Sequence, residues 1–397
     1  MNILSAEIIE NETCLCGSGA LEVAIDLPRF PLTGIYIDSP EPDFNNFHDQ
    51  ALMICMECGH IQLRNILPPK KLYGRHNVHR SAQSHHSPQA IDYFVSYVKS
   101  LVPDRIFKCI LEVGCNDLSL LNRLKVLGSE SIGIDPIWID RDLRNGKNIS
   151  VIGKYIEQVD FALDIPTPPD LIVSTHNLEH IASPIPYYKK LMDRASDDAL
   201  FIIEVPDVGI MFENLRIDQI FMQHNHYYEL RSLLNFIESI DGHYIDHCYN
   251  YNNWGGTILI AFGKGRKKET GNKPKNPWDK NKIRDQYSLY RNRMQGIIKI
   301  VKEIKQDIWG YGAGQMVPTL AYHLRSDLAF LNGILDNNQD RAGLYYPHLK
   351  PQILDADGEY NFDQSMVFIL AQDAVRPIIK RLENFNPGYV LVPGNVY

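Results

Sequence analysis

The sequence lacks a surplus of basic residues. It has 40 Lys and Arg against 48 Asp and Glu, a net charge of -8, so it has little capacity to neutralise phosphates, and we expect no nucleic-acid partner. It also lacks any run approaching the roughly 20 apolar residues of a membrane span, and Met1–Glu7 lacks the basic start and apolar core of a secretory signal. We therefore expect a cytoplasmic protein with no membrane partner.

Cysteine is scarce, and its positions are informative. The chain has seven cysteines, and in a reducing compartment they are interpreted first as metal ligands or core residues. Four of them form two pairs, Cys14-Leu-Cys16-Gly and Cys55-Met-Glu-Cys58-Gly. Four thiolates suit tetrahedral Zn²⁺, and a glycine after each pair lets backbone amides turn toward the sulfurs. We predict one structural zinc; the alternative is two unrelated pairs of free thiols.

The first 75 or so residues have little helical periodicity and many turn formers. So short and irregular a segment buries little apolar surface and needs a metal or another staple. The sequence therefore predicts a zinc-binding module over residues 1–78.

The middle of the chain alternates between strand-like and helix-like segments. Apolar strands are predicted at residues 109–113, 132–135, 170–174, 199–205 and 256–262, and helices near 84–102, 118–127 and 184–195. This alternation is typical of a mostly parallel, doubly wound α/β sheet. We assign it residues 79–265, ending at the basic, polar stretch that begins near Gly263 and predicts a linker.

A second α/β domain is predicted over residues 266–397. A long helix is expected at about 280–305 and another near 374–385, with strands at 307–311, 330–336, 365–370 and 389–393.

One strand-turn-helix segment predicts a cofactor site. Ile110-Leu-Glu-Val-Gly-Cys-Asn-Asp117 runs from a buried strand into a turn, and Asp135 ends the next strand about twenty residues later. Gly114 lets the backbone approach a ligand, and Asp135 can bind ribose hydroxyls. No complete G-x-G-x-x-G is present, which weakens NAD and favours S-adenosylmethionine, whose cationic methionine part suits Glu112. The alternative is an ordinary strand-turn-helix. An NAD-dependent oxidoreductase, based on Gly310–Gly314, is disfavoured because the third glycine is missing.

Together these motifs resemble the sugar C-methyltransferases that act on nucleotide-linked 4-keto deoxysugars. The resemblance covers nearly the whole chain, through the Cys-Gly pairs, the cofactor loop, Asn177-Leu-Glu-His-Ile181, Gln223-His-Asn-His-Tyr-Tyr228 and Gly310-Tyr-Gly-Ala313. It implies a zinc-binding module, a central Rossmann-like class I methyltransferase domain and a C-terminal Rossmann-like α/β domain that binds the substrate nucleotide. A monomer or homodimer is expected.

The resemblance also implies roles for particular residues. The expected cofactor-binding residues are Glu112, Gly114, Asn116, Asp117, Asp135, Asn177 and His180. The expected substrate-binding residues are Gly310, Tyr311, Gly312, Asp336 and Arg341. The expected catalytic group is His224 as general base, with Gln223, His226 and Tyr227 beside it, and an ordinary histidine pKa of ~6.5 suits that role.

The sequence departs from the family pattern at the site itself. The Tyr-x-Glu-His motif of the family reads Phe221-Met-Gln223-His224 here, and a Tyr-rich segment is replaced by one containing His76, His79, His85 and His86. An O-methyltransferase on the same scaffold and a non-catalytic sugar-nucleotide-binding protein therefore stay open as alternatives.

Overall fold

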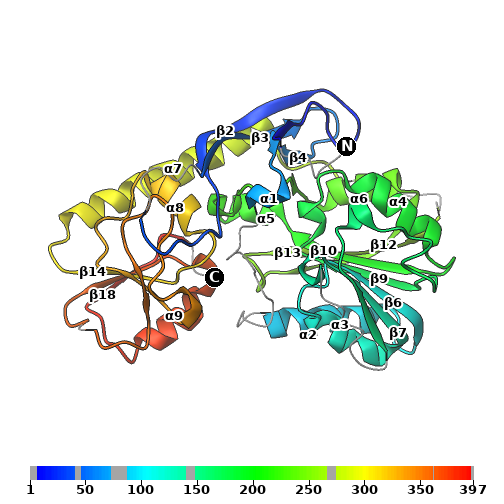
Figure 1. Cartoon of the computed structure of the whole chain (residues 1–397). Helices are drawn as coiled ribbons and strands as arrows, with labels where there is room; N and C mark the ends of the chain where they lie inside the picture. The colour runs from blue at the N-terminus through cyan, green and yellow to red at the C-terminus, as the bar shows by residue number, and fades with distance from the viewer. Residues whose placement is uncertain are drawn as a thin grey trace.

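The computed structural model describes residues 7–40, 46–72, 87–139, 148–265, 274–360 and 362–394. Within these ranges the chain forms a seven-stranded central sheet, a four-stranded N-terminal sheet, a five-stranded C-terminal sheet and a two-stranded ribbon. Figure 1 shows the N-terminal strands lying across the top, between the central sheet on the right and the C-terminal sheet on the left. No helix in this described part of the chain combines the length and apolar character needed to cross a membrane.

The N-terminal sheet is more regular than the sequence predicted. Its strands, in the order β11-β4-β3-β2, are antiparallel. The N-terminal elements are β1 (Ile9–Glu10), β2 (Leu21–Pro31), β3 (Phe47–Cys55), β4 (Ile61–Leu63), β5 (Asn65–Ile66) and α1 (Pro69–Leu72). The 11-residue strand β2 was not predicted from the sequence. Its register shifts between Leu27 and Phe30, and this shift interrupts the alternation of apolar and polar residues that is typical of a strand.

One strand of this sheet comes from the central part of the sequence. β11 (His226–Tyr227) pairs with β4, His226 opposite Gln62 and Tyr227 opposite Ile61. The segment that carries the proposed base is therefore held directly by the N-terminal module.

The central sheet has the order β12-β13-β10-β9-β6-β7-β8. Its strands are β6 (Phe107–Val113), β7 (Gly128–Ile134), β8 (Ile149–Ile152), β9 (Leu171–Thr175), β10 (Leu200–Pro206), β12 (Gly242–Asn250) and β13 (Thr257–Lys264). Its helices are α2 (Ser87–Leu101), α3 (Ser119–Leu124), α4 (Pro184–Arg194), α5 (Val208–Glu213) and α6 (Leu230–Ser239). Strands β6 to β10 and β12 run in one direction, and among the described strands of this sheet β13 runs against them. The carboxyl ends of the parallel strands therefore share one edge, where α/β proteins bind ligands.

The C-terminal sheet is entirely parallel, in the order β16-β15-β14-β17-β18. Its elements are α7 (Lys280–Glu303), β14 (Ile308–Tyr311), α8 (Val317–Leu324), β15 (Ile334–Asp336), β16 (Ile353–Asp355), β17 (Met366–Ile369), α9 (Val375–Leu382) and β18 (Tyr389–Leu391). The predicted Rossmann-like arrangement is confirmed.

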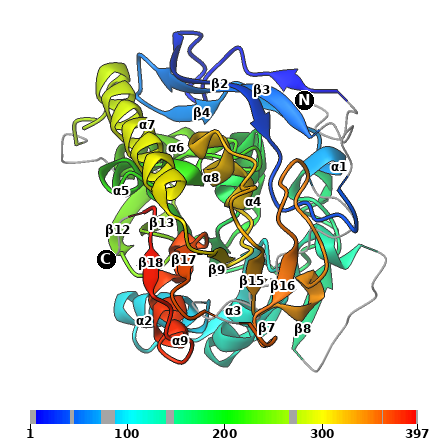
Figure 2. The same ribbon diagram turned by 90° about the vertical axis from the view of Figure 1, so that its left-hand side faces the viewer.

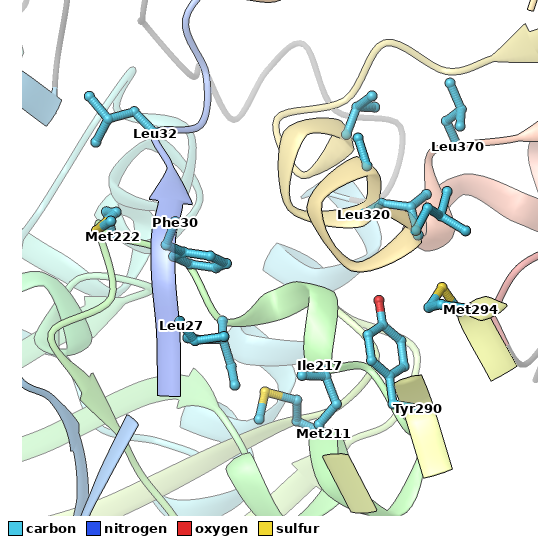
Figure 3. Close-up of a cluster of buried hydrophobic side chains, with 14 of the residues drawn as sticks. Leu27, Phe30, Leu32, Met211, Ile217, Met222, Tyr290, Met294, Leu320 and Leu370 are labelled. Carbon is cyan, nitrogen blue, oxygen red and sulfur yellow. The ribbon is translucent and has the colours of Figure 1, made fainter. Parts of the chain in front are cut away.

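One hydrophobic cluster joins all three parts of the chain. Figure 3 shows Leu27 and Phe30 of β2 beside Met211 and Ile217 of the central part. Tyr290 and Met294 of α7 and Leu320 of α8 complete the cluster from the C-terminal part, and Figure 2 shows α7 and α8 next to the N-terminal strands. Burial of this shared apolar surface fixes the three parts relative to one another.

Candidate zinc centre and active site

The four predicted zinc ligands come together in the N-terminal module. Cys14 Sγ lies 3.5 Å from Cys58 Sγ, and Cys16 Sγ lies 3.7 Å from Cys55 Sγ. All four sulfurs lie within 4.8 Å of one another. Tetrahedral zinc with bonds of about 2.3 Å requires sulfurs about 3.8 Å apart, so the spacing fits this ion.

The glycines after each cysteine pair have the conformation that the sequence predicted. Gly17 and Gly59 have φ of 85° and 79°, a region that other residues rarely adopt. The turn at Gly59 lets the His60 backbone N–H approach Cys58 Sγ at 3.4 Å. Such an amide stabilises a thiolate ligand, so four cysteines with no open position suit a structural zinc.

A cavity of about 790 Å³ opens at the carboxyl ends of β6, β7, β9 and β10. All seven of the expected cofactor-binding residues line it: Glu112, Gly114, Asn116, Asp117, Asp135, Asn177 and His180. The loops after three strands therefore converge on one site, as the parallel order requires.

Gly114 allows Asn177 to approach the turn after β6 closely. Its φ is 82°, and a Cβ there would lie 2.7 Å from Asn177 Cγ. Its N–H donates to the Ile134 carbonyl at 2.8 Å, which holds the turn against β7. A larger residue would push the loop or Asn177 into the cavity.

Asp135 holds the same loop from the end of β7. One carboxylate oxygen accepts the Asn116 N–H and the other accepts the Ile137 N–H, both at 2.9 Å. Burial raises the pKa of Asp135, although these two amides oppose the change. The carboxylate thus has a structural role as well as the expected ribose contact.

Glu112 is a buried acid at the base of the cavity. Its side chain is 2% exposed, and within the described residues Oε2 has no hydrogen-bond partner. Burial, with a smaller contribution from Asp135, raises the pKa of Glu112 to about 8. A cationic group placed beside it would satisfy this carboxyl and favour its ionised form.

The cavity as a whole is acidic. Among the described residues that line it are six acidic residues and one lysine: Glu112, Asp117, Asp135, Glu157, Glu204, Asp373 and Lys154. Lys154 is paired with Asp164 at 2.6 Å. Such a site favours a cationic ligand and disfavours a phosphate within it.

His224 also lines the cavity, next to the expected cofactor residue His180. It is 4% exposed and its ring packs 4.0 Å from Phe221 and 4.7 Å from His180, centroid to centroid. Burial, together with the charges of His180 and His176, holds the pKa of His224 well below 6.5. Its ring is therefore neutral at neutral pH, and it titrates below the ordinary value that the sequence suggested.

Gln223 also lines the cavity, but its amide is bound to the N-terminal module. Thr33 Oγ1 donates to Gln223 Oε1 at 2.9 Å, and Gln223 Nε2 donates to the Thr33 carbonyl at 3.1 Å. This pairing positions the segment that carries His224.

The structure places His226 and Tyr227 outside the cavity lining. His226 Nδ1 lies 3.1 Å from His60 Nε2, and its Nε2 lies 3.1 Å from the Ala182 carbonyl, so both ring nitrogens are engaged. The Tyr227 hydroxyl accepts the Phe221 N–H at 3.1 Å. These two side chains hold the strand β11 and the turn before His224, and neither is placed to contact a ligand in the cavity.

Two polar residues beside His224, Glu179 and His176, were not predicted from the sequence. Glu179 Oε1 lies 3.8 Å from His224 Nε2 and 3.7 Å from His176 Nδ1. Glu179, His180 and His224 also form a group of possible ligand atoms within 4.8 Å of one another. The only sequence signal was the resemblance block Asn177–Ile181, which contains Glu179 without marking a role.

Two family models match the chain. The model described as "Putative zinc binding domain" matches residues 14–73, and the one described as "Methyltransferase domain" matches residues 80–241. Residues 80–241 are a methyltransferase domain. The predicted combination of zinc-binding and methyltransferase domains, with zinc and S-adenosylmethionine as the implied cofactors, is confirmed.

A curated relative and several solved structures are similar to the chain. C-methyltransferase NovU of Streptomyces niveus is 22% identical over 264 residues, which are 63% of this chain and 60% of the relative. N-methyltransferase NodS of Bradyrhizobium japonicum WM9, in complex with S-adenosylhomocysteine, matches with 12% identity and a TM-score of 0.37, over 46% of this chain and 90% of that one. An S-adenosylmethionine-dependent methyltransferase of Clostridium acetobutylicum ATCC 824 matches with 11% identity and a TM-score of 0.35, over 47% and 94%.

The methyltransferase domain contains the features that suit S-adenosylmethionine. Gly114 lets the turn pack closely on Asn177, and Glu112 has a buried carboxyl oxygen, Oε2, without a hydrogen-bond partner among the described residues. The acidic lining suits a ligand with a sulfonium and an ammonium.

The predicted substrate contacts of the C-terminal domain lie away from the methyltransferase cavity. Gly310, Tyr311, Gly312, Asp336 and Arg341 do not line it. Asp336 Oδ2 accepts the Ala313 N–H at 2.6 Å, and Arg341 Nη1 donates to the Ala313 carbonyl at 2.9 Å, so both side chains hold their own loop. Gln315 and Asp373 are the C-terminal residues that reach the cavity.

The predicted histidine cluster, His76, His79, His85 and His86, falls outside the described residues.

Proposed function

We propose that the protein transfers the methyl group of S-adenosylmethionine to a nucleotide-linked sugar, at the carbon beside a 4-keto group, with His224 as general base. The observation that carries this proposal is the position of His224, a neutral imidazole on the wall of the cavity that the cofactor residues line. NovU, which is named a C-methyltransferase, supports the reaction class.

The cofactor residues hold the methyl donor in this proposal. Bound S-adenosylmethionine supplies an electrophilic methyl group on its sulfonium. Glu112 would face the ammonium, Asp135 would bind the ribose, and Gly114 would let the loop lie close to the ligand. Catalysis then depends on positioning the acceptor carbon in line with the methyl group.

His224 prepares the acceptor. It removes the proton from the carbon beside the ketone, and the electron pair is delocalised into the carbonyl as an enolate. The low pKa of His224 means that the acidic limb of the pH–rate profile lies below 6.5, because the ring must be neutral to act.

The acidic lining restricts how a nucleotide sugar can bind. The acidic residues of the lining disfavour a diphosphate inside the cavity, so the sugar enters and the nucleotide stays toward the C-terminal domain. Gln315 and Asp373, the C-terminal residues on the cavity wall, mark that side.

One observation favours O-methylation as a second candidate. The family tyrosine and acid are replaced by Phe221 and Gln223, and Phe221 packs directly on His224 without a polar group to hold an enolate oxygen. O-methylation requires one base and no enolate, so the same imidazole could serve.

The test is a transfer assay with deuterated S-adenosylmethionine and dTDP-, GDP- and CDP-linked 4-keto sugars. Mass spectrometry reports transfer, and the NMR shift of the new methyl group separates a carbon from an oxygen acceptor. Transfer to carbon supports the proposal; transfer only to oxygen, or to none of these sugars, contradicts it.

A further inference from the structure

We propose that Glu179 is a positioning residue for His224, and that it supplies the carboxylate that Gln223 does not. The inference rests on the proposed role of His224 as the base. The acid beside the base then comes from the turn after β9 and not from residue 223, where the family motif has its glutamate.

Glu179 is a buried acidic side chain without a conventional partner. It is 1% exposed, and within the described residues neither of its carboxylate oxygens has a hydrogen-bond partner. Two imidazoles face it, with His176 Nδ1 at 3.7 Å and His224 Nε2 at 3.8 Å from Oε1. A buried carboxylate is costly unless a cation or a donor lies near it. The histidines are the groups that can supply that charge.

Residue 223 cannot provide the acid in this fold. Gln223 Nε2 donates to the Thr33 carbonyl while Gln223 Oε1 accepts from the Thr33 hydroxyl. A carboxylate has no proton to donate, so glutamate would face the Thr33 carbonyl with a negative charge. The amide therefore fits the contact with the N-terminal module, and the anion must come from another element.

Glu179 can act on His224 in two ways. A carboxylate beside Nε2 favours the tautomer with hydrogen on that nitrogen, which leaves Nδ1 as the base. When Nδ1 takes the proton from the sugar carbon, the ring becomes a buried cation. The anion of Glu179 then stabilises it while the carbon forms a bond to the methyl group and the methyl–sulfur bond breaks.

Several charged or titratable groups face His224, and they divide into two sets. Burial disfavours the protonation of His224 most, and His180 and His176 add to this effect, which lowers its pKa. Glu179 is the acid within ion-pair distance, and Tyr227 faces the ring from β11 at 6.1 Å between centroids. Glu179 also acts on His176: burial lowers the pKa of His176, but Glu179 and Glu204 outweigh it and raise that pKa above its ordinary value.

The experiment compares Glu179→Gln, which removes the charge, with Glu179→Asp, which keeps it. Glu383→Gln, on an exposed site at the end of α9, is the matched control. The pH dependence of kcat is measured with the acceptor found in the transfer assay. NMR titration of His176 is measured without substrate, so it does not depend on the proposed function.

For Glu179→Gln we expect kcat to fall about 10- to 100-fold and the acidic limb to move to lower pH by about one unit or more. The acidic limb moves to lower pH because the protonated imidazole of His224 is less favourable without the anion of Glu179. The KM for S-adenosylmethionine should stay within about twofold. The pKa of His176 should fall, whereas Glu179→Asp and the control should keep the wild-type profile.

An acidic limb and a His176 titration that are both unchanged in Glu179→Gln would overturn the proposal. So would a second metal equivalent in the wild type that is lost in Glu179→Gln, because Glu179 would then be a metal ligand. A lowered His176 pKa with full turnover would show that Glu179 acts on His176 alone and would overturn its role toward His224, whereas the role of His224 as base is tested separately by His224→Gln.

Discussion

The buried acid Glu112 makes cofactor binding a proton-release reaction. In the empty site burial raises the pKa of Glu112 from 4.5 to about 8. At pH 7 the carboxyl is then about 90% protonated, and an ammonium placed beside it favours the ionised form. Binding of S-adenosylhomocysteine should therefore release about 0.9 proton per chain at pH 7 and about 0.1 at pH 9.

The same pKa predicts how the empty protein responds to pH. The pKa of Glu112 is higher in the folded protein than in the unfolded chain. The free energy of unfolding of the empty protein therefore falls as pH rises from 4.5, the unfolded pKa, to about 8. The penalty is at most about 5 kcal/mol, since each tenfold change in proton affinity corresponds to about 1.4 kcal/mol. Glu112→Gln should therefore raise the thermal stability of the empty protein at pH 8 and weaken cofactor binding.

Calorimetry in buffers with different ionisation enthalpies measures the protons released. The slope of the observed enthalpy should match about 0.9 proton for the wild type at pH 7 and approach zero for Glu112→Gln. Equal slopes for the two proteins would refute the reasoning, because the released proton would come from another group.

Two further predictions concern the metal and the ribose contact. Purified protein should contain about one zinc per chain, and Cys16→Ser should lose it and lower the melting temperature, because metal binding contributes to folding; a stable protein without metal would exclude the structural role. Asp135→Ala should weaken S-adenosylhomocysteine binding by about 1.5–3 kcal/mol, measured by calorimetry, since it removes a charged hydrogen-bond acceptor. Unchanged affinity would place the ribose carboxylate elsewhere, and a melting curve would separate this contact from the loop hydrogen bonds to Asn116 and Ile137.

The sequence predicted those parts of the fold that depend on local pattern. The strands predicted at 109–113 and 199–205 are apolar runs interrupted by a single glutamate each, and the structure has β6 and β10 there. The edge strands β8 and β12 were missed, because β8 has four residues and β12 carries polar residues along much of its length. Such strands depend on their neighbours in the sheet more than on their own periodicity.

The candidate site was also predictable only where a local sequence pattern encodes it. The cysteine pairs and the Gly114–Asp135 arrangement are recognisable because ligand spacing and turn chemistry appear directly in the sequence. Glu179 was not recognisable, because its partner His224 lies 45 positions away and is held by a strand pairing with the N-terminal module. The roles of His226 and Asp336 were likewise decided by contacts that no local pattern encodes.

Proton removal by His224 is tested most directly by hydrogen exchange at the sugar carbon. With S-adenosylhomocysteine in the cofactor site, the nucleotide-linked 4-keto sugar is incubated in deuterated water and followed by NMR, with an enzyme-free sample for background. We expect the wild type to exchange the hydrogen beside the ketone, and His224→Gln to slow this exchange by about 10²–10⁴-fold. Methyl transfer by the wild type without any enzyme-dependent exchange, or full exchange by His224→Gln, would contradict the assignment of His224 as the base for carbon methylation.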